Sequence, residues 1–119
     1  MTPQERKETP VFTGVLLYFK RAISELSRLS LAGNRQHHDD KPLHWDMLKS
    51  KDELDAGIRH LLDAGKVDTD GQLHATKGAW RANAYLEREL RYREDHNIPN
   101  TESVKYQDVI DYNGKDLQD

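Results

Sequence analysis

The sequence has no cysteine among its 119 residues. This absence excludes disulfide bonds, zinc sites built from thiolates and cysteine nucleophiles. No apolar run approaches the roughly 20 residues that a membrane-spanning helix needs, and no signal peptide opens the chain. Glycine-rich phosphate loops and the Gly-x-Ser-x-Gly elbow of serine hydrolases are absent too. We therefore expect a cytoplasmic protein that makes no contact with a membrane.

Positive charge is also scarce, because 18 basic residues face 21 acidic ones and leave a net charge of −3. Nucleic acids and anionic membranes attract positively charged surfaces, so this balance argues against a general binder of either, and we expect no sequence-specific nucleic-acid binding. Hydrophobic residues make up only 35% of the chain. A single domain of this size has little apolar material for its own core, so a core shared between subunits would help.

Helical periodicity is the dominant pattern, and nowhere does an alternating apolar pattern run for more than a few residues. The sequence therefore predicts an all-α fold, a bundle of three main helices without a sheet, completed by oligomerisation. The three helices are expected over residues 14–33, 51–65 and 73–94.

The organisation expected around these helices is simple. Residues 1–12 form an N-terminal arm, residues 13–94 the helical domain, and residues 95–119 a polar tail that is loosely packed or depends on a partner.

The first helix is expected to start with Thr13 as its N-cap and to stop at Gly33 and Asn34, a good left-handed pair. Glu25 lies at the margin of its apolar face, where a glutamate is usually a surface residue. The residues predicted to face the core are Leu16, Phe19, Ile23 and Leu26.

The central helix is the segment around which the chain is organised. Ser50 and Glu53 have the spacing of a capping box, in which each side chain binds a free backbone amide at the start of the helix. Apolar residues then recur at helical spacing and predict a core-facing stripe. That stripe consists of Leu54, Ile58, Leu61 and Gly65.

Asp52, Asp55 and Arg59 form a second stripe on the same helix, because residues three and four apart share a face. Two carboxylates on one helix edge suit Mg²⁺, which prefers hard oxygen ligands. The alternative is that acidic residues of the first turn only complement the helix dipole.

The segment from residue 34 to residue 49 breaks the helical pattern and is rich in polar side chains. Such a loop inside a compact domain is often functional. Zinc binding by its histidines is one interpretation, but no two of them have the i, i+4 spacing of a helical ligand pair, so a solvated loop is favoured. The residues concerned are His37, His38, Asp39, Asp40 and His44.

Two tryptophans and two cations are further candidates, and all of them except Trp45 lie in the expected third helix. Trp45 is expected either to anchor the polar loop or to stack on a nucleobase, and Trp80 to lie in the core or at a subunit interface. Lys77 and Arg81 share one edge of the helix, which is either solvated or binds phosphate. A stripe of small and apolar residues allows close helix packing and consists of Ala75, Ala79, Ala82, Leu86 and Leu90.

A series of short motifs resembles one phage-associated family in order and spacing. The motifs are Thr9-Pro-Val-Phe-Thr-Gly-Val-Leu, Gly33-Asn34 with His37, Pro42-Leu-His-Trp45, Asp52-x-x-Asp55, Arg59-His-Leu-Leu62, Asp68-x-Asp-Gly71, His74 and Ala79-Trp-Arg81. Between about Lys7 and Leu90 the chain resembles the dATP/dGTP diphosphohydrolase domain, a MazG-like branch of the all-α nucleotide pyrophosphohydrolases.

This resemblance implies an oligomeric helical bundle that hydrolyses a purine deoxynucleoside triphosphate to the monophosphate and pyrophosphate. It also implies a role in controlling nucleotide pools, in a phage-infected or prophage-bearing cytoplasm. Mg²⁺, with Mn²⁺ as a substitute, would be bound by Glu25, Asp52 and Asp55, which would be the catalytic residues. Candidates for binding the phosphates and base are His37, Trp45, Arg59, Lys77 and Arg81.

Two positions depart from the family pattern. Arg28 stands where related enzymes carry a second glutamate on the first helix, and Arg35 stands where a glutamate follows Gly33-Asn34. Each change replaces a carboxylate with a cation near the expected metal. A second function therefore stays open, that of a non-catalytic helical module that binds nucleotides or another protein.

Overall fold

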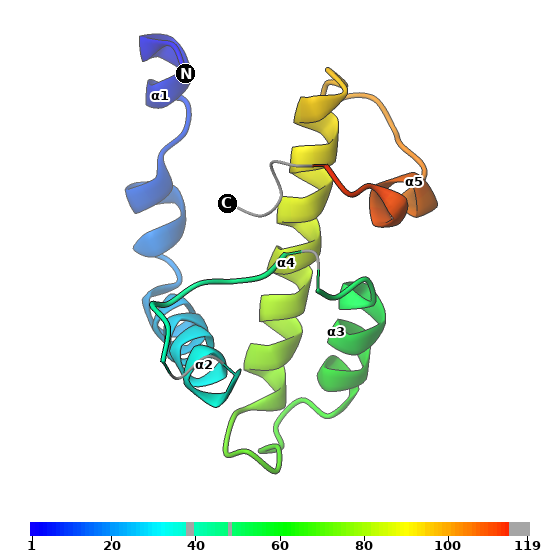
Figure 1. Cartoon of the computed structure of the whole chain (residues 1–119). Coiled ribbons are helices and arrows are strands. Elements are labelled where there is room, and N and C mark those ends of the chain that lie inside the picture. The colour runs from blue at the N-terminus through cyan, green and yellow to red at the C-terminus, as the bar shows by residue number, and fades with distance from the viewer. Residues whose placement is uncertain (38–39, 48, 115–119) are drawn as a thin grey trace.

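A computed structural model of the chain describes residues 1–37, 40–47 and 49–114, and these residues are predominantly helical (Figure 1). Apart from one isolated bridge between Val67 and Leu73, the described ranges contain no β-structure. The all-α prediction is confirmed at this level. The helical elements are α1 (Pro3–Lys7), η1 (Phe12–Leu16, a short π-helix), α2 (Lys20–His37), α3 (Glu53–Leu62), α4 (His74–Asp95) and α5 (Tyr106–Asp111).

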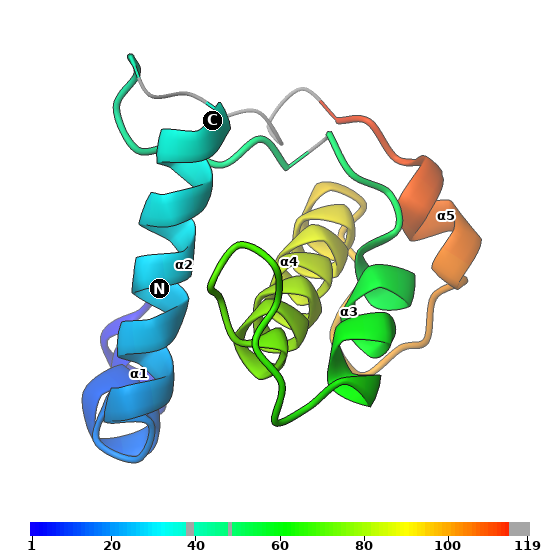
Figure 2. The same cartoon turned by 90° about the horizontal axis from the view of Figure 1, so that it is seen from below.

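Helix α4 is the central element of the fold. Helices α2 and α3 contact α4 from different sides, and α5 contacts its C-terminal half (Figures 1 and 2). The short helix α1 lies at the far end of the N-terminal segment, away from α3 and α4 in both views. No helix within the described part of the chain is long and apolar enough to pass through a bilayer.

The contact between α3 and α4 is built on small residues. Gly57 of α3 and Gly78 of α4 face each other, and a Cβ atom added at Gly78 would lie 2.6 Å from Leu61 Cδ2 and 3.3 Å from the carbonyl oxygen of Gly57. Ala56, beside Gly57, is also buried. Because only glycine leaves room for this approach, the two helices pack with their backbones close together.

The predicted core stripe of the central helix is wrong in part, since Leu54 is half-buried but most of the stripe is exposed. Ile58 is 58% exposed and Leu61 is 46% exposed, whereas the buried residues of α3 are Glu53, Ala56 and Gly57. The periodicity predicted an amphipathic helix correctly. The face of α3 that packs against α4 is the one with its smallest residues, because the two helices approach closely.

The N-terminal helical region also differs from the prediction. Thr13 lies inside η1 rather than at an N-cap, and the long helix starts at Lys20. It continues past Gly33 and Asn34 to His37. The Asn34 side chain bonds to the following loop instead of ending the helix. Its amide nitrogen donates to the Lys41 carbonyl at 3.2 Å, and its oxygen accepts from the His44 amide at 3.3 Å.

Large apolar side chains are exposed along the N-terminal segment. Leu16 and Phe19, which were predicted to face the core, are 37% and 54% exposed. Ile23 and Leu26 are half-buried. The other exposed apolar residues of this segment are Val11, Phe12, Val15, Leu17 and Tyr18.

The C-terminal segment packs on α4, contrary to the expected loose tail. Val109 is fully buried and Ile110 is 7% exposed. Arg88, itself 1% exposed, donates hydrogen bonds to the backbone carbonyls of Val109, Ile110 and Tyr112 at 2.9–3.3 Å. A charged donor thus binds the segment through backbone carbonyls, which apolar periodicity cannot reveal. Residues 115–119 lie outside the described part of the chain.

Candidate functional site

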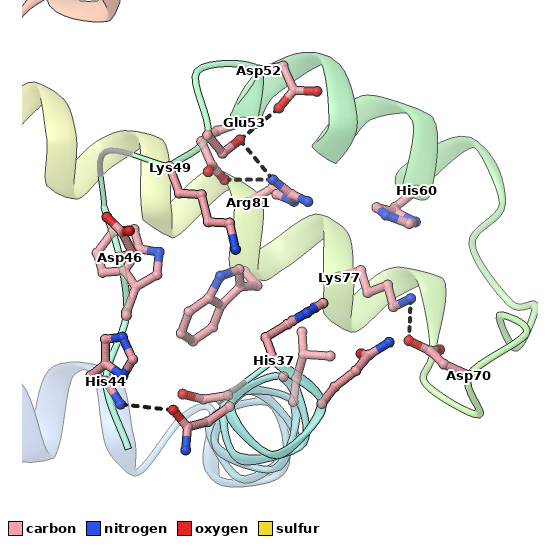
Figure 3. Close-up of a pocket in the computed structure, with 18 residues that line it drawn as sticks. His37, His44, Asp46, Lys49, Asp52, Glu53, His60, Asp70, Lys77 and Arg81 are labelled. Atoms are coloured by element: carbon pink, nitrogen blue, oxygen red, sulfur yellow. Dashed lines mark hydrogen bonds and ion pairs between the residues drawn. The ribbon is translucent and has the colours of Figure 1, made fainter. Parts of the chain in front are cut away.

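A cavity of about 480 Å³ opens between α2, the loop before α3, and the N-terminal half of α4 (Figure 3). Its volume lies within the range of small-molecule sites. Residues of α2, the loop before α3, α3, the turn after it and α4 form its wall, and Figure 3 shows His37, Lys49, Lys77 and Arg81 arranged around one space. The other charged or histidine residues of the wall are His44, Asp46, Asp52, Glu53, His60 and Asp70.

One side of the cavity is a network centred on Arg81. The Arg81 guanidinium donates to Ser50 Oγ at 3.2 Å and to Glu53 Oε2 at 3.4 Å. The Glu53 side chain is only 7% exposed, so Arg81 neutralises a buried carboxylate. Ser50 Oγ in turn donates to Asp52 Oδ1 at 2.7 Å.

This network replaces the predicted capping box. Asp52, not Ser50, is the N-cap residue of α3, and no side chain caps the helix there. Ser50 and Glu53 bind Arg81 instead, because α4 lies close enough to offer them a cation. The hydrogen bond from Ser50 lowers the pKa of Asp52, and nearby Arg81 and Arg59 lower it further, so Asp52 is ionised at neutral pH.

Lys77 forms the second charged group of the wall. Its Nζ lies 2.7 Å from Asp68 Oδ2 and 2.7 Å from Asp70 Oδ2. Burial lowers the pKa of Lys77, but the hydrogen bonds to the two aspartates outweigh burial and raise it. The turn that supplies both carboxylates includes Gly71 at φ +84°, a conformation that glycine adopts readily.

Both tryptophans of the chain line the cavity. The rings of Trp45 and Trp80 contact edge to face, with centroids 6.1 Å apart and an interplanar angle of 77°. Asn34 secures the loop that carries Trp45 through its bonds to Lys41 and His44. The cavity therefore combines an aromatic wall with cations, which suits a ligand that has a flat ring and an anionic group.

The structure brings together most of the residues that were predicted to bind substrate. His37, Trp45, Lys77 and Arg81 all line the cavity, and so does Asp52. Arg59 does not line it and forms a largely exposed ion pair with Asp52 at 3.6 Å.

The three carboxylates predicted to bind Mg²⁺ are not brought together. Glu25 forms an ion pair with Arg28, and neither Glu25 nor Asp55 lines the cavity. Among the described residues, the one group of histidines and acidic residues with ligand atoms within 4.8 Å of one another is a different one. Because α2 and α3 contact α4 from different sides, the predicted ligand set does not fit a shared magnesium ion in this arrangement.

Several residues of the wall were not predicted from the sequence. Glu53 was assigned to a cap, although a glutamate three residues after a serine is equally free to turn toward an incoming cation. Lys49 and Asp70 occupy loops, where spacing carries no information about direction. The segment from residue 34 to residue 49, which was considered for zinc binding, is only partly described, since His38 and Asp39 lie outside the described residues.

Searches of protein-family models, of curated proteins and of solved structures found no match to this chain. The fold and the cavity therefore define the molecule as an all-α protein with a mixed aromatic and charged pocket.

Proposed function

We propose that the cavity binds a purine deoxynucleoside triphosphate. The observation that supports this proposal best is that Trp45, from the loop before α3, meets Lys77 and Arg81 of α4 in one cavity of about 480 Å³. A tryptophan stacks on a nucleobase, and cations on α4 bind phosphate oxygens. The choice of a purine deoxynucleotide rests on the resemblance of the motifs to dATP/dGTP diphosphohydrolases.

The charge of the wall affects which form of the nucleotide binds. Three cations, Lys49, Lys77 and Arg81, stand beside four carboxylates, so the wall has no surplus of positive charge. A free triphosphate would meet repulsion there. The Mg²⁺ complex of the nucleotide carries less negative charge, and we expect it to bind more tightly than the free nucleotide.

Hydrolysis to the monophosphate and pyrophosphate is the second part of the proposal. Asp52 favours it, because Asp52 is the one predicted metal ligand that lines the cavity, and it is ionised at neutral pH. The alternative is a nucleotide-binding module without catalysis, as the separation of Glu25 and Asp55 from the cavity would produce.

Tryptophan fluorescence and pyrophosphate release separate these functions. Since both tryptophans line the cavity, their emission should change on adding dATP or dGTP with Mg²⁺. Lys77→Met should weaken binding about tenfold by removing a charged contact, whereas Lys66→Met, an exposed lysine outside the cavity wall, should not. Pyrophosphate release that is lost in Asp52→Asn supports the hydrolase, binding without release supports the module, and no fluorescence change refutes both.

We propose further that the bundle is completed by self-association. The exposed apolar residues of the N-terminal segment and of α4, where Leu86 is 50% and Leu90 is 37% exposed, would be buried in a homo-oligomer with α4 at the interface. Light scattering that reports a single chain at micromolar concentration would refute this proposal.

A further inference from the structure

Two histidines and an aspartate meet beside the cavity, where no role has been assigned to them. His60 comes from α3, Asp68 from the turn after it, and His74 is the first residue of α4. One ligand atom from each residue lies within 4.8 Å of the other two, and all three side chains are partly buried. We call this group the histidine cluster.

The distances within the histidine cluster are close to those of a metal site. His60 Nδ1 and His74 Nδ1 are 2.9 Å apart, and His74 Nε2 is 3.9 Å from Asp68 Oδ1. In a tetrahedral zinc site with bonds of about 2.0 Å, ligand atoms are roughly 3.3 Å apart. These two distances involve different nitrogens of His74, so only one of its ring nitrogens would bind the metal, and one ligand atom from each residue already lies within 4.8 Å of the other two.

The contact between the two imidazoles is itself informative. Two neutral rings that face each other through Nδ1 share one proton, because two lone pairs at 2.9 Å would repel. Burial, together with Lys77 and His74, lowers the pKa of His60, so its ring is neutral at pH 7. A metal ion placed between the rings would take the place of the shared proton and accept a lone pair from each imidazole.

The charge around the histidine cluster also suits a divalent cation. Asp68 and Asp70 share Lys77, so two carboxylates face one ammonium and one negative charge remains. The hydrogen bonds from Lys77 and from the Thr69 amide lower the pKa of Asp68 to about 2, which leaves this carboxylate ionised. Asp70 holds Lys77 in place even if Asp68 turns its second oxygen toward a metal.

We propose that His60, Asp68 and His74 bind a zinc ion, with a water in the fourth position. Two imidazole nitrogens and one carboxylate oxygen are the ligands of many zinc sites, whereas Mg²⁺ prefers oxygen ligands alone. The proposal does not depend on the nucleotide function, because it concerns zinc binding by the chain without nucleotide. It also differs from the magnesium site expected from the sequence, which uses other residues and another metal.

Titration of the metal-free full chain with Zn²⁺ tests this site. We expect calorimetry to show one Zn²⁺ per chain, and Co²⁺ to give the visible absorption of a tetrahedral complex with nitrogen and oxygen ligands. His60→Gln and His74→Gln keep a polar side chain of similar size and should each weaken zinc binding at least tenfold. Asp68→Asn should weaken it as well, and Mg²⁺ should not compete.

His96→Gln is the matched control, because His96 is an exposed histidine that contacts Tyr92 and Tyr112 outside the cavity. Its zinc affinity should equal that of the unmodified chain. Far-UV circular dichroism of each variant shows that the helices are retained. Absence of zinc binding by the unmodified chain up to about 1 mM would overturn the proposal. Undiminished binding by both His60→Gln and His74→Gln would overturn it equally, since the ion would then lie elsewhere.

Discussion

Helix α4 carries two cations that line the cavity, Lys77 and Arg81, and two buried arginines beside the C-terminal segment, Arg88 and Arg93. The cavity pair is bound by carboxylates and remains open to water, with side chains 19% and 33% exposed. The other pair is 1% and 9% exposed and donates mainly to neutral backbone carbonyls. Basic side chains of one helix therefore donate to carboxylates at the cavity and mainly to backbone carbonyls at the C-terminal segment.

The difference indicates two roles for a cation on a helix. At the cavity, a carboxylate partner can be exchanged for a ligand's phosphate while water compensates the charges. At the C-terminal end, Arg88 has no such freedom, because it is 1% exposed and its partners are backbone carbonyls. We expect substitutions to affect ligand binding at the first end and folding at the second.

Arg88→Met should give the largest loss of stability. It removes a donor from the carbonyls of Met47, Val109, Ile110 and Tyr112, of which Val109 keeps its bond from the Tyr112 amide. Each buried acceptor left without a donor costs about 1–3 kcal/mol, so the free energy of unfolding should fall by about 3 kcal/mol or more. Urea denaturation measures this change. The exposed Arg21→Met serves as control and should stay within about 0.5 kcal/mol of the unmodified chain.

Arg81→Met should be less costly and should be reversible by a second change. Removing Arg81 leaves the carboxylate of Glu53 buried without its cation, which should lower the free energy of unfolding by about 1–3 kcal/mol. Adding Glu53→Gln removes that charge and should restore most of the loss in urea denaturation. If the double variant is as unstable as Arg81→Met alone, the ion pair is not the cause.

Gly78→Ala tests the close approach of α3 and α4 that places Arg81 next to Glu53. The new methyl group would meet Leu61 at 2.6 Å and the Gly57 carbonyl at 3.3 Å, so the Leu61 side chain must move and α3 must give slightly. We expect a loss of about 1–2 kcal/mol in the free energy of unfolding. Gly33→Ala is the matched control in α2, where nothing lies within 4 Å. It should instead gain up to about 1 kcal/mol from helix propensity.

Acid should weaken the contacts of Asp68 at the cavity end of α4. The pKa of Asp68 is lowered from 3.8 to about 2 by Lys77 and the Thr69 amide. A lowered pKa in the folded state gives stability that is present above pH 4 and is lost as the pH falls toward 2. Asp68→Asn should therefore reduce the dependence of thermal stability on pH between 4 and 2. Arg88→Met should leave that dependence unchanged, since carbonyls do not titrate in this range.

The sequence by itself determined the all-α class, the bounds of the longest helix, and the aromatic and charged residue types that line the cavity. Residues 73–94 were expected to be helical, and α4 spans His74–Asp95. Gly65 at φ +93° ends the expected helix 51–65, and Gly71 at φ +84° lies between it and the expected helix 73–94, where the chain turns. These features depend on interactions over a few residues, which periodicity and turn chemistry describe well.

The tertiary structure alone decided which faces are buried and which site residues meet. Small residues on α3 and α4 brought these helices together, so Glu53 is buried and Ile58 is exposed. The position of α2 kept Glu25 out of the cavity, while His37 near the end of the same helix lines it. Arg88 fixed the C-terminal segment through backbone carbonyls, which have no signature in the sequence. Whether a residue is buried depends on the side chains of the element that packs against it, and a local sequence pattern does not contain that information.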